Sequence, residues 1–338
     1  MRLPRVLARL LVLVGLLLSP PSAQSQSNDV GLERLRTEIQ RLSTAARGKV
    51  GVGLIHLESG RELFVNGDEG FPMASTVKVP IAVQLLTRVD RRQVRLDSMI
   101  TVQASDLHPG SGTLSNLFDD PGVVLSLRNL TELMLLISDN SATDIVLRSA
   151  GGGSAVNERL AALGVTGISA NRSTIQLIAD AIGVTDLGPE SAWTLSGFAA
   201  KARQVSPEAS KAAATAFYRD PRDTATPLGM ARLLQKLWKG EALSRPNTDL
   251  LLDIMLRCET GAMRIKGLLP PGTDVRHKTG SLGIGVANDV GIVTLPDGAG
   301  HVVMTIFVKE SLVDAVAQER VIAQVARAAY DYFLFTSK

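Results

Sequence analysis

The chain has 338 residues, of which 45% are hydrophobic and 20% charged, enough for one large or two closely packed domains around an ample core. Three of its 36 basic residues, Arg2, Arg5 and Arg9, lie in the first nine positions, so the remainder carries 33 basic and 33 acidic residues. This balance argues against a nucleic-acid partner or an anionic membrane partner. The single cysteine, Cys258, excludes an internal disulfide.

Residues 1–24 have the pattern of a secretory signal peptide. Three arginines precede an apolar run at residues 10–18, and small polar residues follow it. The run is shorter than the roughly 20 apolar residues that span a bilayer, and no cysteine follows it to carry a lipid. We therefore expect a periplasmic or secreted protein without a stable membrane anchor. A retained N-terminal anchor is the alternative.

The N-terminal part predicts a helix and then a hairpin. Apolar residues recur at helical spacing in residues 32–46, and two strand-like runs, 49–57 and 62–65, flank a polar turn. The apolar stretch that follows predicts a buried central helix that contains Ser75 and Lys78 and has Pro80 in its first turn. Beyond it, residues 101–122 are rich in turn formers and predict a loop with short helices.

The middle of the chain predicts further helices and its end predicts strands. Helical patterns cover residues 127–137, 142–150 and the segment from Thr226-Pro227 to Gly240, where threonine and proline are typical of a helix start. Three strand-like runs begin at Asp274, Asp289 and Val302, and a last helix follows from about residue 313 to 333.

Strands near both ends of the chain therefore bracket a helical middle. This order favours an α+β fold: an antiparallel sheet built from N- and C-terminal strands, flanked by helices, with an inserted all-α domain. We expect residues 29–72 and 262–338 to form the sheet domain and residues 73–261 to form the helical domain.

Three short motifs could carry chemistry, and they are Ser75-x-x-Lys78, Ser138-Asp139-Asn140 and Lys278-Thr279-Gly280. A serine and a lysine three residues apart lie on one face of a helix, so the Lys78 amine can come within reach of the Ser75 hydroxyl. A buried lysine with a lowered pKa can take the serine proton and create a nucleophile. Taken singly, each motif has an ordinary explanation as a solvated pair, a helix stop or a strand edge. Only the three together are specific.

In these motifs and their order the sequence resembles the class A β-lactamases, and the resemblance covers nearly the whole mature chain. It implies an exported serine hydrolase that β-lactams acylate at Ser75 and that hydrolyses the β-lactam amide. It also implies that Lys78 assists deprotonation of Ser75 and that Ser138, near Lys278, relays a proton to the leaving nitrogen. The backbone N–H groups of Ser75 and Ser281 would form the oxyanion hole.

The resemblance further implies a set of substrate-binding residues: Asn140 for a side-chain amide, and Thr279, Gly280, Ser281 and Arg264 near Lys278 for a carboxylate. The substrate would be a small molecule, either a β-lactam or a peptidoglycan-like D-alanyl peptide, bound by a monomer without a cofactor. The four histidines, at 56, 108, 277 and 301, lack metal-ligand spacing, which argues against the zinc-dependent route to the same reaction. His277 alternates with Lys278 along a strand, so we expect a structural role for it.

The sequence departs from the family in the Ω-loop region, residues 172–223. A gapless count places the family's loop arginine on Arg172, but its deacylating glutamate falls on Thr174 and its water-holding asparagine on Ile178. After an insertion at about residues 179–220, Asp223 matches the aspartate that closes the loop. We expect Arg172 and Asp223 to pair across the base of the loop.

This departure leaves three alternatives open. The insertion could supply another carboxylate base, with Glu190 and Glu208 as candidates. Otherwise turnover is slow, and the protein behaves as a penicillin-binding protein or a D-alanyl-D-alanine peptidase. A non-catalytic cell-wall binding or sensor module is the third alternative, but it would not need Lys78, and the intact lysine counts against it.

Overall fold

The computed structural model describes residues 29–118 and 122–336, so the signal peptide expected at residues 1–24 lies outside the described residues. Within the described ranges, no helix is both long enough and apolar enough to cross a membrane.

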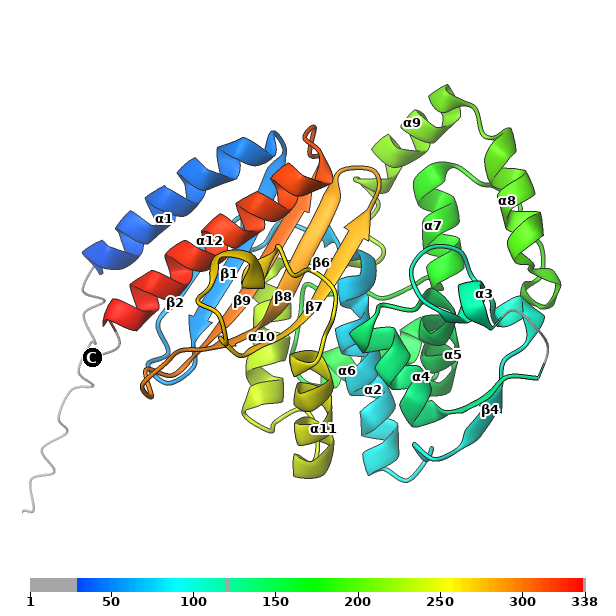
Figure 1. Ribbon diagram of the computed structural model, residues 1–338, viewed down its shortest axis with the longest axis horizontal. Helices are drawn as coiled ribbons and strands as arrows, with labels where there is room; N and C mark the ends of the chain where they lie inside the picture. Colours follow the sequence, from blue (N-terminus) through cyan, green and yellow to red (C-terminus); the bar gives the residue numbers. More distant parts are fainter. Residues whose placement is uncertain (1–28, 119–121, 337–338) are drawn as a thin grey trace, which may run out of the picture.

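A five-stranded antiparallel sheet is the centre of the fold (Figure 1). In spatial order its strands are β2 (Glu62–Val65), β1 (Lys49–His56), β9 (His301–Lys309), β8 (Val286–Thr294) and β7 (Val275–Leu282). Strands from the two ends of the chain meet where β1 pairs with β9 in antiparallel register. This arrangement confirms the predicted α+β fold.

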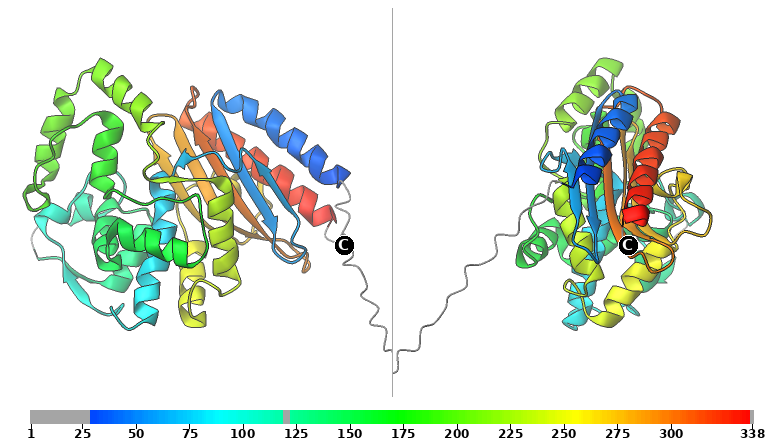
Figure 2. Two further views of the ribbon diagram at one scale, coloured as in Figure 1. Left: turned by 180° about the vertical axis from the view of Figure 1, so that it is seen from behind. Right: turned by 90° about the vertical axis from the view of Figure 1, so that its left-hand side faces the viewer.

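Helices cover both faces of the sheet, which explains why the strands are almost continuously buried. Helices α1 (Val30–Ser43) and α12 (Ala315–Thr336) lie side by side on one face (Figure 2), and α10 (Pro227–Trp238) packs against the other. Because successive side chains of a strand point to opposite faces, Val302 and Met304 of β9 enter the core under α1 and α12. Val303 and Phe307 enter the core on the opposite face.

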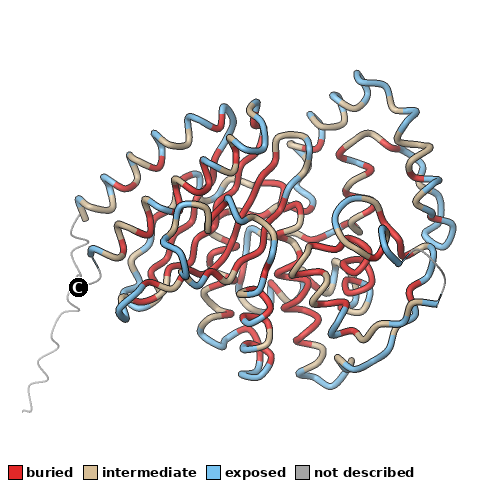
Figure 3. Tube along the Cα trace, viewed as in Figure 1, coloured by how far each residue is buried: buried red, intermediate tan, exposed pale blue. Residues whose placement is uncertain are grey.

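The central helix is α2 (Lys78–Asp90), and it is preceded by a 3₁₀ turn, η2 (Ala74–Val77). Its first ten residues are buried, and Pro80 lies in its first turn, as predicted. Figure 3 shows this burial continuing from α2 into the strands of the sheet. Ser75 is therefore held in a 3₁₀ turn rather than in the α-helix itself, and in a 3₁₀ turn residues i and i+3 lie above one another.

The remaining helices are α3 (Leu114–Leu117), α4 (Leu127–Leu136), α5 (Asn140–Ala150), α6 (Gly152–Ala162), α7 (Thr174–Ile182), α8 (Leu195–Gln204), α9 (Pro207–Phe217) and α11 (Arg245–Leu256). The inserted part is not wholly helical, however. It also contains β4 (Met99–Thr101), which pairs with β5 (Val124–Ser126), and β6 (Thr224–Ala225), which pairs with β3 (Phe71–Pro72). Strands of two or three residues are too short to show a period-2 pattern in the sequence.

The base of the Ω-loop region is closed by the pair that the sequence predicted. The Nε atom of buried Arg172 lies 2.6 Å from Oδ2 of Asp223, whose other oxygen accepts the backbone N–H groups of Asn171 and Arg172. Nη1 of Arg172 also contacts Asp180 at 2.7 Å and Asp220 at 3.2 Å. One guanidinium therefore holds both ends of the region together.

Replacing Arg172 should destabilise the whole protein, because the change leaves the carboxylate of Asp223 buried without its partner. We expect Arg172→Ala to lower the free energy of unfolding in urea by about 3 kcal/mol. The matched control is Arg222→Ala, since Arg222 contacts Asp180 and Asp220 from an exposed position and should contribute less than about 1 kcal/mol. Equal effects of the two substitutions would contradict this assignment.

Candidate active site

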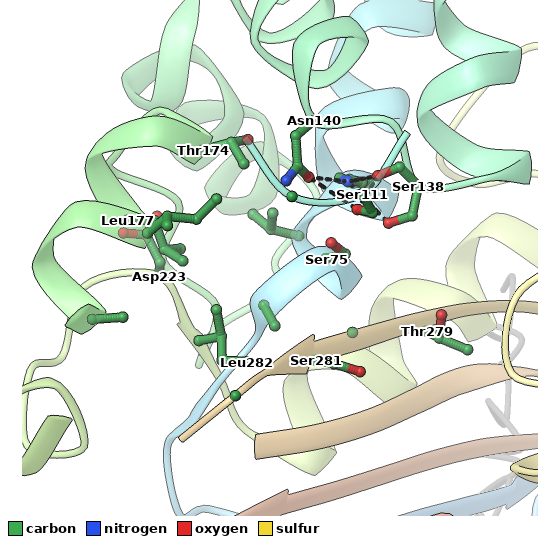
Figure 4. A pocket seen from close by; sticks show the side chains of 18 of the residues that line it. Ser75, Ser111, Ser138, Asn140, Thr174, Leu177, Asp223, Thr279, Ser281 and Leu282 are labelled. Carbon is green, nitrogen blue, oxygen red and sulfur yellow. Dashed lines mark hydrogen bonds between the residues drawn. The ribbon is translucent and has the colours of Figure 1, made fainter. Parts of the chain in front are cut away.

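A cavity of about 570 Å³ opens where the edge strand β7 meets the helical part of the molecule (Figure 4). The predicted site residues that line it are Ser75, Lys78, Ser138, Asn140, Thr279, Gly280, Ser281 and Arg264. They come from four separate places: the start of α2, the connection between α4 and α5, strand β7 and the segment before η5 (Ile265–Leu268). The volume of the cavity is in the range of a small-molecule site.

The turn that carries Ser75 is held rigidly against the sheet. Nδ2 of Asn288, on β8, donates to the carbonyl oxygens of Pro72 and Met73, both at 2.9 Å. Strand β7 passes so close that a β-carbon on Gly280 would lie 2.6 Å from the Met73 oxygen and 3.0 Å from the Ser75 nitrogen. Only glycine permits this approach, which brings the backbone of β7 beside the backbone N–H of Ser75.

Lys78 is buried, with 1% of its surface exposed, and its amine has three hydrogen-bond acceptors. Nζ donates to the carbonyl oxygen of Ser138 at 2.7 Å, to Oγ of Ser138 at 3.0 Å and to Oδ1 of Asn140 at 3.1 Å. These three bonds use every proton of an ammonium group. The amine must therefore lose a proton before its nitrogen can accept one from Ser75.

The surroundings of Lys78 favour that neutral state. Burial lowers its pKa well below the usual range of lysine, and the positive charge of Lys278 lowers it further, against smaller opposing effects of Asp139 and Asp144. A lysine of this kind is suited to act as a general base near neutral pH.

Ser138 lies between two lysines. Its Oγ accepts from Nζ of Lys78 and from Nζ of Lys278, each at 3.0 Å. Since a hydroxyl oxygen has two lone pairs, this arrangement leaves the Ser138 proton free to be donated into the cavity. Ser138 has a left-handed backbone with φ of 62°, an uncommon conformation for a non-glycine residue and one that cannot be read from the motif.

Lys278 is the second cation, and it is completely buried. Burial lowers its pKa to about 8. Its Nζ also donates to the carbonyl oxygen of Thr279 at 3.0 Å. Lys278 does not line the cavity, so its charge reaches a ligand through Ser138 and Thr279 rather than by direct exposure.

Asn140 is fixed on both sides of its amide. Oδ1 accepts from Lys78, and Nδ2 donates to the carbonyl oxygen of Pro109 at 2.9 Å. The neighbouring Asp139 caps helix α5 by accepting from the N–H of Ala142, and it also accepts the N–H groups of Thr113 and Leu114. The second motif thus ties the turn at residues 108–113 to the site.

Two cavity residues were missed by sequence reasoning. Ser111 Oγ donates to the carbonyl oxygen of Ser138 at 2.7 Å, and the hydroxyls of Thr260 and Thr279 lie 2.6 Å apart. Both Ser111 and Thr260 line the cavity. The glycine-rich turn around Ser111 was visible in the sequence as a turn, but nothing in its pattern indicated which side of the molecule it would face. Thr260 carried no sequence signal.

Arg264 is held by the backbone of the sheet. Its guanidinium donates to the carbonyl oxygens of Gly280 and Asn288 at 3.0 and 2.8 Å, and to Oγ of Ser281 at 2.6 Å, while its Nε contacts Glu319. Arg264 therefore lies at the cavity edge, where it positions Ser281. His277 does not line the cavity. Its Nδ1 contacts Oδ1 of buried Asp289 at 2.9 Å.

The face of the cavity made by the Ω-loop region has no available carboxylate. Thr174 and Ile178 line it, as the gapless count predicted. Among the lining residues of the described chain, Asp223 alone carries a carboxylate, and Arg172 holds it. Neither Glu190, which pairs with Arg148 at 3.3 Å, nor Glu208 lines the cavity, so the structure brings neither candidate base to it.

The chain is similar to known β-lactamases over nearly its whole length. The sequence profile described as "Beta-lactamase enzyme family" matches residues 34–333. The β-lactamase VEB-1 of Pseudomonas aeruginosa is 28% identical, over 96% of this chain and 97% of its own. The crystal structure of TLA-1 extended-spectrum β-lactamase is similar with a TM-score of 0.74 and 29% identity, over 90% of this chain and 99% of that one. A mutant of PBP-A, solved as an acyl-enzyme complex with penicillin G, has a TM-score of 0.70 and 29% identity, over 88% of this chain and 97% of that one.

The two buried lysines should titrate abnormally. In a ¹³C NMR titration of protein labelled at lysine Cε, we expect the Lys278 signal to have a midpoint near pH 8 and the Lys78 signal to titrate well below an ordinary lysine at about 10.4. Lys278→Arg and Lys78→Arg assign the two signals. Exposed Lys49, whose pKa its partner Glu69 raises, is the internal control. Midpoints above pH 10 for both buried lysines would refute the electrostatic account.

Proposed function

Because the chain belongs to the beta-lactamase enzyme family, we propose that it is a serine hydrolase that β-lactams acylate at Ser75, and that hydrolysis of the acyl-enzyme is its slow step. The observation that carries the first half of this proposal is the position of Ser138 Oγ between the Nζ atoms of Lys78 and Lys278. Such an arrangement can move a proton from an attacking hydroxyl to a leaving nitrogen.

Acylation follows from the roles of four side chains. Neutral Lys78 takes the proton of Ser75, and Oγ of Ser75 forms a bond to the carbonyl carbon of the lactam. The developing oxyanion accepts the backbone N–H groups of Ser75 and Ser281. When the carbon–nitrogen bond breaks, Ser138 gives its proton to the leaving nitrogen. Ser138 regains a proton from the protonated Lys78, and the positive charge of Lys278 favours this transfer.

Substrate binding would use the polar rim of the same cavity. Thr279 and Ser281, beside buried Lys278, would bind a carboxylate, with Arg264 orienting Ser281 and Gly280 allowing close approach of the strand. The free N–H of the Asn140 amide, the one that does not donate to Pro109, is available to a carbonyl of the substrate.

Deacylation lacks its base. Hydrolysis of an ester needs a water molecule and a group that takes its proton. Thr174 and Ile178 have no titratable group, and between them they have only one hydrogen-bonding side-chain atom to hold the water. The second half of the proposal rests on this apolar Ω-loop face. A second candidate function is a penicillin-binding D-alanyl peptidase, which is supported by the similarity to a mutant of PBP-A solved as an acyl-enzyme complex with penicillin G.

The buried Lys78 argues against the third alternative, a cell-wall binding or sensor module without catalysis. A binding module would gain nothing from burying a cation beside a second one, because each buried charge must be compensated. Export to the periplasm or the cell exterior is part of the proposal, and its basis is the sequence of residues 1–24.

The nucleophile can be identified by mass spectrometry. We expect benzylpenicillin to add its whole mass to the mature protein and the adduct to be absent in Ser75→Ala.

Lys78→Ala should lower the acylation rate by about 10²- to 10⁴-fold, because it removes general base assistance. An adduct that persists in Ser75→Ala, or an unchanged rate in a folded Lys78→Ala protein, would sink the proposal.

Slow deacylation predicts burst kinetics. With a chromogenic cephalosporin we expect a burst near one equivalent of enzyme and then a slow steady phase. Thr174→Glu should raise the steady rate by at least about tenfold, since it places a carboxylate on the cavity wall, whereas the isosteric control Thr174→Gln should not.

Two outcomes would contradict the burst prediction. One is fast linear turnover of the wild type without a burst. The other is loss of the steady rate in Glu190→Gln or Glu208→Gln, which would show that the insertion supplies a base despite its distance from the cavity.

A further inference from the structure

The insertion in the Ω-loop region builds one end wall of the cavity. Helix α9 packs against α7, and at its C-terminal end Phe217 is buried with Leu177 and Ala181. Leu282, the last residue of β7, and Ile284, in the turn that follows, pack against the same cluster, and the Tyr218 hydroxyl donates to the carbonyl oxygen of Ile284. The insertion thus bridges the two sides of the cavity beyond Ser281.

This end of the cavity is apolar, and we call it the end compartment. The side chains that define it are Leu177, Ile178, Ala181, Ile182, Leu282 and Ile284. From α9, Ser210 also lines the cavity. Gly183, at the end of α7, lets α9 approach closely, because a β-carbon there would lie 3.2 Å from Cβ of Ala213.

The end compartment offers no partner to a charged group. Four charged side chains line the cavity in the described chain: Lys78, Arg172, Asp223 and Arg264. Arg172 and Asp223 hold each other, Lys78 donates to Ser138 and Asn140, and Arg264 is bound to the sheet and Glu319. A carboxylate or ammonium that entered the compartment would lose its hydration without gaining a counter-ion, which is costly.

The orientation that acylation requires of a bound substrate places its acyl group in this compartment. The leaving nitrogen must lie beside Ser138, which supplies its proton, and so the leaving group lies toward Thr279. Figure 4 shows Ser138 and Thr279 on one side of Ser75, and Leu177 and Leu282 on the other. The part of the substrate that stays on Ser75 therefore points toward α7 and α9.

We propose that helix α7, backed by α9, together with the end of β7 and the turn that follows it makes the enzyme selective for acyl donors with a compact apolar acyl substituent, aryl or alkyl, and against charged or extended peptidyl substituents. This inference rests on the proposed acylation of Ser75. Its determinants are Ile182, the last residue of α7, and Ile284, in the β7–β8 turn, and both side chains line the compartment.

The test compares three penicillins with one nucleus. They are 6-aminopenicillanic acid, which has no acyl side chain, benzylpenicillin, and α-carboxybenzylpenicillin, which differs from benzylpenicillin by one carboxylate. We expect the second-order acylation constant of benzylpenicillin to exceed that of its carboxylated analogue by at least about tenfold. Release of D-alanine from diacetyl-L-lysyl-D-alanyl-D-alanine should be slower still, because its acyl part is an extended peptide.

Ile182→Lys supplies the missing counter-ion and should lower the benzylpenicillin preference by about tenfold, with both rates referred to that of 6-aminopenicillanic acid in the same variant. The matched controls are Ile182→Met, which keeps the wall apolar, and Val316→Lys, which adds the same charge at an exposed site on α12 outside the cavity. Both should keep the wild-type preference.

The outcomes separate this inference from the proposed function. Acylation by all three penicillins at similar rates, or an unchanged preference in a folded Ile182→Lys protein, would overturn the inference alone. Efficient release of D-alanine from the peptide would do the same. Failure of every penicillin to acylate Ser75 would overturn the proposed function and this inference with it.

Discussion

The burial of two lysine side chains around one serine hydroxyl is the constraint on which the site depends. Lys78 and Lys278 have almost no exposed surface, and both donate to Oγ of Ser138. Like charges at such proximity are unfavourable, so the arrangement persists only because a helix, an interhelical connection and a strand meet around it. Burial lowers the pKa of both lysines, and the positive charge of Lys278 lowers that of Lys78 further.

The rest of the fold can be understood as the frame for that contact. Asn288 anchors the turn before Ser75, and Gly280 lets β7 touch it, so the nucleophile is fixed relative to the sheet. Two non-glycine residues with left-handed backbones, Ala74 and Ser138, lie beside the reacting groups. Strain of this kind is retained where the surrounding packing over-determines the conformation, and here both residues belong to the cavity wall.

The Ω-loop region keeps the structural part of the family pattern but lacks its acid–base residues. Arg172 and Asp223 still close its base. Thr174 and Ile178 line the cavity beside it, and neither side chain has an acid–base function. The insertion that follows adds apolar side chains to the cavity rather than a carboxylate. The proposed slow deacylation therefore rests on the side chains that α7 presents to the cavity.

The sequence by itself determined the sheet, the central helix and the three motifs, because helical spacing, caps such as Thr226-Pro227 and short motifs are local signals. It also predicted the Arg172–Asp223 pair by comparison with a family pattern. The tertiary structure alone decided that Ser111 and Thr260 join the site, that Arg264 binds the sheet, and that Glu190 and Glu208 lie outside the cavity. These facts depend on contacts between residues far apart in the chain, such as Ser138 and Lys278, which are separated by 140 positions. Such contacts arise only when whole elements pack.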